Sequence, residues 1–154
     1  MASMTTNKFR ELIMNGGIDL DNAADTAVKV MLVQNTYTPD RDHDFVSSIT
    51  SGTTKELTGG TGYTGGFGGS GRKALTGKTI VKDNATDKAY WDATDSSWNA
   101  INSGTIGYVV VIREVTADSD SPILVIIDVP DTATNGSDLT LQWAADGICN
   151  ITSP

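Results

Sequence analysis

Apolar residues alternate with polar ones along most of this chain, and one stretch near its start instead follows helical spacing. Phe9, Leu12 and Ile13 recur at i, i+3 and i+4, which places them on one face of a helix. Polar residues just before them can cap the first turn, and Gly16–Gly17 can supply the left-handed residue that ends a helix. The pattern predicts a single helix, over residues 5–16.

The remaining apolar pattern predicts strands. Residues 27–34 carry apolar side chains on both faces, which is typical of an internal strand. Residues 107–115 and 122–129 are rich in β-branched side chains and flank a polar loop, which predicts an antiparallel hairpin. Shorter runs predict further strands, over residues 73–82, 88–92, 97–101, 138–143 and 147–151. About seven strands joined by short turns predict a mainly β fold, either an antiparallel β-sandwich or a barrel.

Residues 58–72 form a Gly-rich loop or arm, since eight of its first fourteen residues are glycine. Glycine loses the most backbone entropy on ordering, so we expect this segment to order only against another surface. Tyr63 and Phe67 should dock into a groove of the same domain or of a neighbouring subunit. Residues 1–57 are too poor in strands to bury a core alone, so we expect one domain over residues 1–154.

Charge narrows the classes of partner. The chain has 19 Asp and Glu against 11 Lys and Arg, for a net charge of −8. Without a basic patch we expect it to bind neither nucleic acid nor an anionic membrane. No segment approaches the ~20 apolar residues that span a bilayer. Residues 1–6 lack the basic stretch of a signal peptide, so we expect synthesis in a cytoplasm.

Motifs for catalysis are incomplete. Residues 60–65 match G-x-G-x-x-G, but no strand is predicted before them and no helix after them, as a dinucleotide site requires. Residues 66–73 resemble a phosphate-binding loop only loosely, because a strand follows them. His43 and Cys149 are the whole supply of His and Cys, too few for a zinc site. We therefore predict no catalytic, cofactor-binding or metal-binding residue, and no enzyme activity.

Two weaker kinds of site stay open. Asp40, Asp42 and Asp44 begin like a calcium loop, but the Gly and Glu that an EF-hand needs further on are missing. Trp91 and Trp98 lie in strand-like segments and are most simply core or sheet-face residues, although an exposed pair would suit a carbohydrate. Cys149, a single cysteine without an internal disulfide partner, is expected to be a small buried hydrophobe.

A set of short segments resembles a family of small proteins encoded by tailed bacteriophages and prophages. The segments are Lys8-Phe-Arg-Glu-Leu, Val28-Lys-Val-Met-Leu-Val, Tyr37-Thr-Pro-Asp, Gly60-Thr-Gly-Tyr-Thr-Gly-Gly, and Leu141-Gln-Trp followed by Asp146-Gly-Ile. Their order covers nearly the full length of the chain. They are distinctive as a set and carry no catalytic chemistry.

The resemblance implies a structural protein of the virion, above all one that decorates or cements the capsid as a homotrimer on the major capsid protein. Flexible segments of such a protein reach across subunit seams, so Phe9, Tyr63, Phe67 and Arg72 are candidate subunit contacts. The alternatives are a tail, neck or fibre-associated virion protein, and a carbohydrate-binding module for host attachment.

Overall fold

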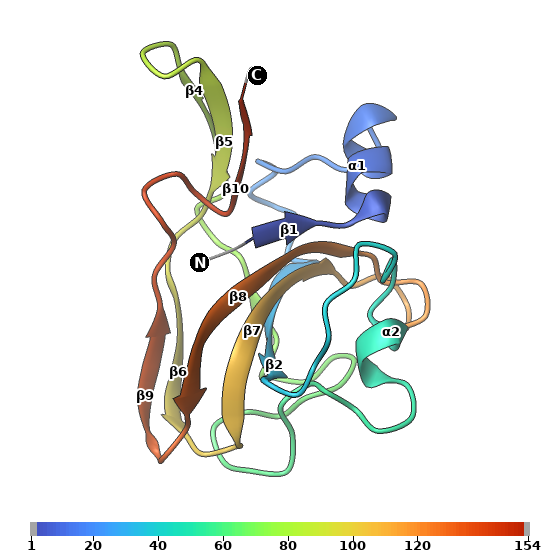
Figure 1. The fold of residues 1–154 in the computed structure, drawn as a ribbon, viewed down its shortest axis with the longest axis vertical. Helices are drawn as coiled ribbons and strands as arrows, with labels where there is room; N and C mark the ends of the chain where they lie inside the picture. The colour runs from blue at the N-terminus through green and yellow to red at the C-terminus, as the bar shows by residue number, and fades with distance from the viewer. Residues whose placement is uncertain (1–2, 153–154) are drawn as a thin grey trace.

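A five-stranded antiparallel sheet forms the centre of the molecule (Figure 1). The structure is a computed structural model that describes residues 3–152. The order of the strands is β1-β8-β7-β2-β3. Their bounds are β1 (Ser3–Thr5), β2 (Val28–Gln34), β3 (Lys73–Ala74), β7 (Thr105–Arg113) and β8 (Ile123–Ala133). Strands from the first 57 residues pair with strands from the last third, so both halves of the chain share one sheet.

Both faces of this sheet are covered, which explains the unbroken apolar run of β2. Val30 and Leu32 point into one core cluster, where β6, β9 and the Gly-rich loop cover the sheet. Met31 and Val33 point into a second cluster, which includes Ile49 of α2 (Ser47–Thr50). The predicted internal strand at residues 27–34 is confirmed.

Two smaller sheets complete the fold. β6 (Ser96–Ile101) pairs with β9 (Ser137–Leu141) and forms the second layer over the first core cluster. β10 (Cys149–Thr152), β5 (Lys88–Asp92) and β4 (Thr79–Asp83) form a three-stranded sheet that projects beyond the body (Figure 1). The arrangement is mainly β and sandwich-like, as predicted, and it is not a closed barrel.

The helix α1 (Asn7–Met14) forms where its spacing predicts it. The Thr6 side chain accepts a hydrogen bond from the backbone N–H of Phe9 at 3.1 Å and so caps the first turn. Gly16 has a φ of +69°, the left-handed conformation expected just after the helix. Phe9 is fully buried and anchors α1 on the first core cluster. No helix in residues 3–152 is long and apolar enough to cross a membrane.

The boundaries of several strands differ from the prediction. The single strand predicted over residues 73–82 is two strands, β3 and β4, which belong to different sheets. Between them the buried ammonium of Lys78 donates to the carbonyls of Asp25 and Leu75 and holds the connecting turn. The strand predicted over residues 122–129 is longer in the structure: β8 continues to Ala133, because it stays paired with β7. The structure has ten strands within residues 3–152, where about seven were predicted.

Candidate functional site

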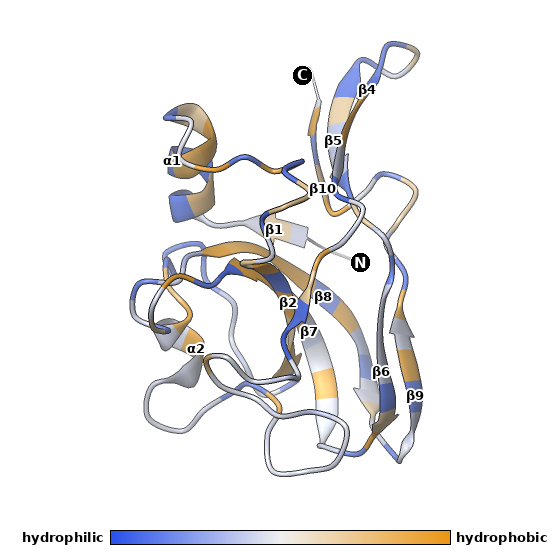
Figure 2. Cartoon of the chain, turned by 180° about the vertical axis from the view of Figure 1, so that it is seen from behind, coloured by the Kyte–Doolittle hydropathy of each residue, from blue (hydrophilic) through white to orange (hydrophobic). Residues whose placement is uncertain are grey.

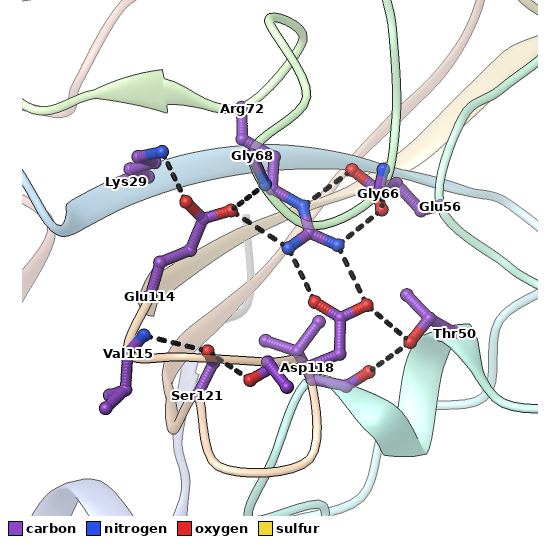
Figure 3. A network of polar contacts seen from close by, with 12 residues as sticks. Lys29, Thr50, Glu56, Gly66, Gly68, Arg72, Glu114, Val115, Asp118 and Ser121 are labelled. Atoms are coloured by element: carbon purple, nitrogen blue, oxygen red, sulfur yellow. Dashed lines mark hydrogen bonds and ion pairs between the residues drawn. The ribbon is translucent and has the colours of Figure 1, made fainter.

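Three acidic side chains surround Arg72, which is buried and only 3% exposed (Figure 3). Its Nε and Nη2 donate to the two carboxylate oxygens of Glu56 at 2.9 and 2.7 Å. Its Nη1 donates to Glu114 at 3.0 Å and to Asp118 at 2.7 Å, and Nη2 also reaches Asp118 at 3.2 Å. These five hydrogen bonds match the five N–H donors of a guanidinium. We call these four residues the Arg72 cluster.

The Arg72 cluster holds the Gly-rich loop against the body. Glu56 accepts hydrogen bonds from the N–H of Gly66 at 2.9 Å and from the hydroxyl of Tyr63 at 3.1 Å. That hydroxyl accepts in turn from the N–H of Leu32 in β2 at 3.0 Å. Tyr63 was expected to dock either into its own domain or into a neighbouring subunit. In the structure it docks into its own domain. Residues 58–72 are a packed loop in this structure, rather than an extended arm.

Ionisation of the acids in the cluster is favoured by their partners. Burial opposes the charge of Glu114, but hydrogen bonds from Lys29 and Arg72 outweigh it and lower the pKa of this carboxyl. The pKa of Asp118 is lowered in the same way, against burial, by hydrogen bonds from Arg72 and Thr50. A buried charge with so many partners is held in one geometry, which suits it to joining segments of the chain.

The residues predicted as subunit contacts divide into two groups. Phe9, Tyr63 and Arg72 are buried within their own chain, because each fills a place in the core or in the Arg72 cluster. A subunit contact through these three side chains stays a prediction. Phe67 is 47% exposed and is the one candidate of the four that remains open to a partner.

Other candidates from the sequence are also placed by the structure. The Nδ1 of His43 lies 2.7 Å from the hydroxyl of Tyr37. Asp40 accepts a hydrogen bond from the backbone N–H of Asp42, as in an ordinary turn. Among residues 3–152, no group of three or more His, Cys, Asp or Glu side chains could hold a metal ion. Burial raises the pKa of Cys149 to about 11, which leaves its thiol mostly protonated near neutral pH.

The two tryptophans considered for carbohydrate binding lie inside the molecule. Trp91 and Trp98 are 2% and 1% exposed. Their indole N–H groups donate to the backbone carbonyls of Leu20 at 2.9 Å and Gly71 at 2.6 Å. Trp98 thus fixes the end of the Gly-rich loop, and Trp91 fixes the chain that follows α1. Both are core residues, and neither forms an exposed platform.

A second candidate site is a groove between α1 and the projecting sheet, with a volume of about 640 Å³. Its walls approach each other where the rings of Phe9 and Trp91 meet, with centroids 6.3 Å apart. Six large hydrophobic residues are exposed in the described part of the chain, and four of them line this groove. The four are Ile13, Met14, Ile80 and Ile151. Figure 2 shows hydrophobic colour on both α1 and β10. We call this site the apolar groove.

Sequence reasoning missed the apolar groove and the Arg72 cluster. Ile13 was predicted to share one face of the helix with Phe9 and Leu12, yet it is 38% exposed and lines the groove. One local signal was present: Leu12, Ile13 and Met14 are three consecutive apolar residues in a short helix, too many for a single narrow buried face. The Arg72 cluster has no such signal in the local sequence, because Arg72 is far along the chain from its three acidic partners.

Comparisons with known proteins assign no family to this chain. No family model matches it. No curated protein and no solved structure matches it either. Sandwich-like β folds host many unrelated functions, so function has to follow from the chemistry of the sites. The two sites offered by residues 3–152 are a saturated cluster of buried charges and an open apolar groove.

Proposed function

We propose that this protein is a structural component of a tailed-bacteriophage virion, and specifically a decoration protein that cements the capsid shell. The apolar groove is the observation that carries the proposal. Contiguous exposed apolar surface on a soluble domain marks a place of association. Among residues 3–152, four of the six exposed large hydrophobic residues gather at one corner of the molecule.

The Arg72 cluster supports the same proposal. A protein that braces a shell has to keep its shape under load, and a Gly-rich loop would otherwise be the softest part of the molecule. A hydrogen bond between Leu32 and Tyr63 ties this loop to β2, and the ion pair of Arg72 with Asp118 ties it to the loop before β8. All five N–H groups of Arg72 are engaged within the protein, so the cluster supplies rigidity instead of a reactive group.

The segments that resemble the phage family also belong to this framework. Residues 28–33 form most of β2 in the centre of the main sheet, and residues 60–66 belong to the loop under Arg72. Asp146-Gly-Ile leads into β10 at the apolar groove. The resemblance thus falls on residues that build the body and one wall of the groove, as expected if assembly is the shared role.

The copy number of the protein in purified virions tests the proposal. Quantitative mass spectrometry should find it in a fixed, high ratio to the major capsid protein, and cryo-electron microscopy should place it over the shell as a homo-oligomer, with a trimer expected at local threefold points. A few copies confined to the tail or neck would transfer the proposal to the tail or neck alternative. Absence from the particle would reject a virion role.

A carbohydrate-binding role is the weaker alternative. It was expected to use Trp91 and Trp98, and both side chains are buried with their indole N–H groups already bonded. Sugar platforms need exposed aromatic faces. No observation in the described residues favours this role over assembly.

A further inference from the structure

We propose that the apolar groove binds an apolar segment of the partner protein that carries at least one carboxylate, with Arg10 and Lys82 as its cationic contacts. This inference rests on the proposed function, in which the partner is a subunit of the shell. Beyond that function, the inference specifies which surface of this protein contacts the partner and the chemical character of the partner segment that occupies the groove.

The walls of the groove determine its apolar character. One wall is α1, which contributes Ile13 and Met14, the latter 88% exposed. The other wall is one face of the projecting sheet. The register places Ile80 beside Trp91, and Ala89 beside Ile151, so these side chains share that face. A partner segment that enters between the two walls contacts hydrophobic side chains on both sides.

The charged residues at the groove indicate that the partner segment is acidic. Among the described residues no Asp or Glu lines the groove, although acids outnumber bases by 19 to 11 in the chain. Arg10 lines it from α1, and its only side-chain hydrogen bond among the described residues runs from Nε to the hydroxyl of Thr5 at 3.0 Å. The register places Lys82 opposite Ala89, so Lys82 shares the sheet face of Ile80 and lies at the margin of the groove, outside its lining residues. Within residues 3–152 Lys82 has no ion pair. The α1 wall and the margin of the sheet wall therefore each offer a cation without an acidic partner in this part of the chain, which is complementary to an acidic segment.

No other surface of the described chain combines these features. Phe67 and Val115 are exposed singly, as surface hydrophobic residues commonly are. A second cavity, between β9 and the strands β7 and β8, has a volume of about 250 Å³. None of the six large hydrophobic residues exposed within residues 3–152 lines it.

A binding assay with shell particles that lack this protein tests the inference. The purified full chain is added to particles from a deletion strain, and the bound copies are counted after sedimentation. Ile80→Asp in the groove is compared with Val115→Asp outside it, a matched pair because both side chains are 49% exposed. We expect Ile80→Asp to weaken binding at least about tenfold, since it buries an unpaired charge in the interface, and Val115→Asp to bind like the wild type.

A charge-reversal variant tests the acidic part of the inference. Arg10→Glu combined with Lys82→Glu should weaken binding about tenfold, and the binding of the wild type should weaken as salt rises. Unchanged or tighter binding by the double variant would overturn the carboxylate contact. Circular dichroism melting curves check that each variant is folded.

The outcomes separate the two proposals. If the wild-type chain does not bind the particles, the decoration function fails and the groove inference fails with it. If the wild type binds and Ile80→Asp binds equally well, the function stands and the groove inference is overturned. If Ile80→Asp converts an oligomer to a monomer in analytical ultracentrifugation, the groove holds a second copy of this chain, which also overturns the inference.

Discussion

The Gly-rich loop and the projecting three-stranded sheet show that regular secondary structure and burial of side chains do not go together in this protein. The loop lacks regular hydrogen bonding, yet it buries Tyr63 and Arg72 and is tied to β2. The sheet has regular strands, yet it leaves Ile80 and Ile151 exposed. Regular structure satisfies the backbone, but burial depends on which side chains meet a covering layer. The loop therefore belongs to the rigid body, and the sheet provides the surface that is free to bind.

The largest expected effect on stability is at Arg72, which holds the Gly-rich loop against the body. Arg72→Met removes the cation shared by three acids and leaves Glu56 and Asp118 without a cationic partner among the described residues, while Glu114 keeps only Lys29, so we expect a loss of about 3–5 kcal/mol in the free energy of unfolding. Urea denaturation measures it. The matched control is Arg113→Met, which removes a single, more exposed ion pair to Asp25 and should cost less than about 1 kcal/mol. Equal losses for the two variants would contradict the central role of Arg72.

Acid should act on the same cluster. The pKa values of Glu114 and Asp118 are lowered in the folded chain from their usual values of 4.5 and 3.8. Their stabilising effect is therefore present above those values and is lost as the pH falls through the lower pKa values of the folded state. We expect the melting temperature to fall steeply below a pH of about 4.

The Arg72→Met variant provides the control for the effect of pH. Without Arg72 each of the two carboxyls loses one of the partners that favour its charged form, with Lys29 left for Glu114 and Thr50 for Asp118. The fall of the melting temperature in acid should therefore be shallower than in the wild type. Differential scanning calorimetry from pH 7 to pH 3 compares the two proteins. Parallel curves would place the acid sensitivity elsewhere in the molecule.

A smaller effect is expected from one hydroxyl in the loop. Tyr63→Phe keeps the ring but leaves the N–H of Leu32 without its partner, which should cost about 1–3 kcal/mol. Tyr90→Phe is the matched control, since the hydroxyl of Tyr90 has no hydrogen bond among the described residues. That control should change the free energy of unfolding by less than about 0.5 kcal/mol. Chemical denaturation of both variants measures the difference.

The smallest effect on stability is expected in the apolar groove. Met14→Ser changes a side chain that is 88% exposed, so the free energy of unfolding should change by less than about 0.5 kcal/mol. Thermal melting of the isolated protein checks this expectation. A large loss would mean that Met14 supports the body, and the contrast between a rigid loop and a free groove would then be too simple.

Local sequence patterns predicted those parts of the fold that depend on neighbouring residues. The double-sided apolar run of residues 27–34 predicted an internal strand, and helical spacing with a polar cap predicted α1. Periodicity could not divide residues 73–82 between two sheets, because the break depends on Lys78 reaching the carbonyl of Asp25. The glycine content predicted a loop over residues 58–72 but could not say which surface would order it.

The sequence by itself determined a mainly β chain with one capped helix, because strand and helix periods place neighbouring side chains on shared faces. Only the tertiary structure decided the two sites. Arg72 meets Glu56, Glu114 and Asp118 across separations of 16, 42 and 46 residues, and no local pattern records such pairings. The apolar groove likewise exists because α1 and β10, from opposite ends of the chain, lie side by side without filling the space between them.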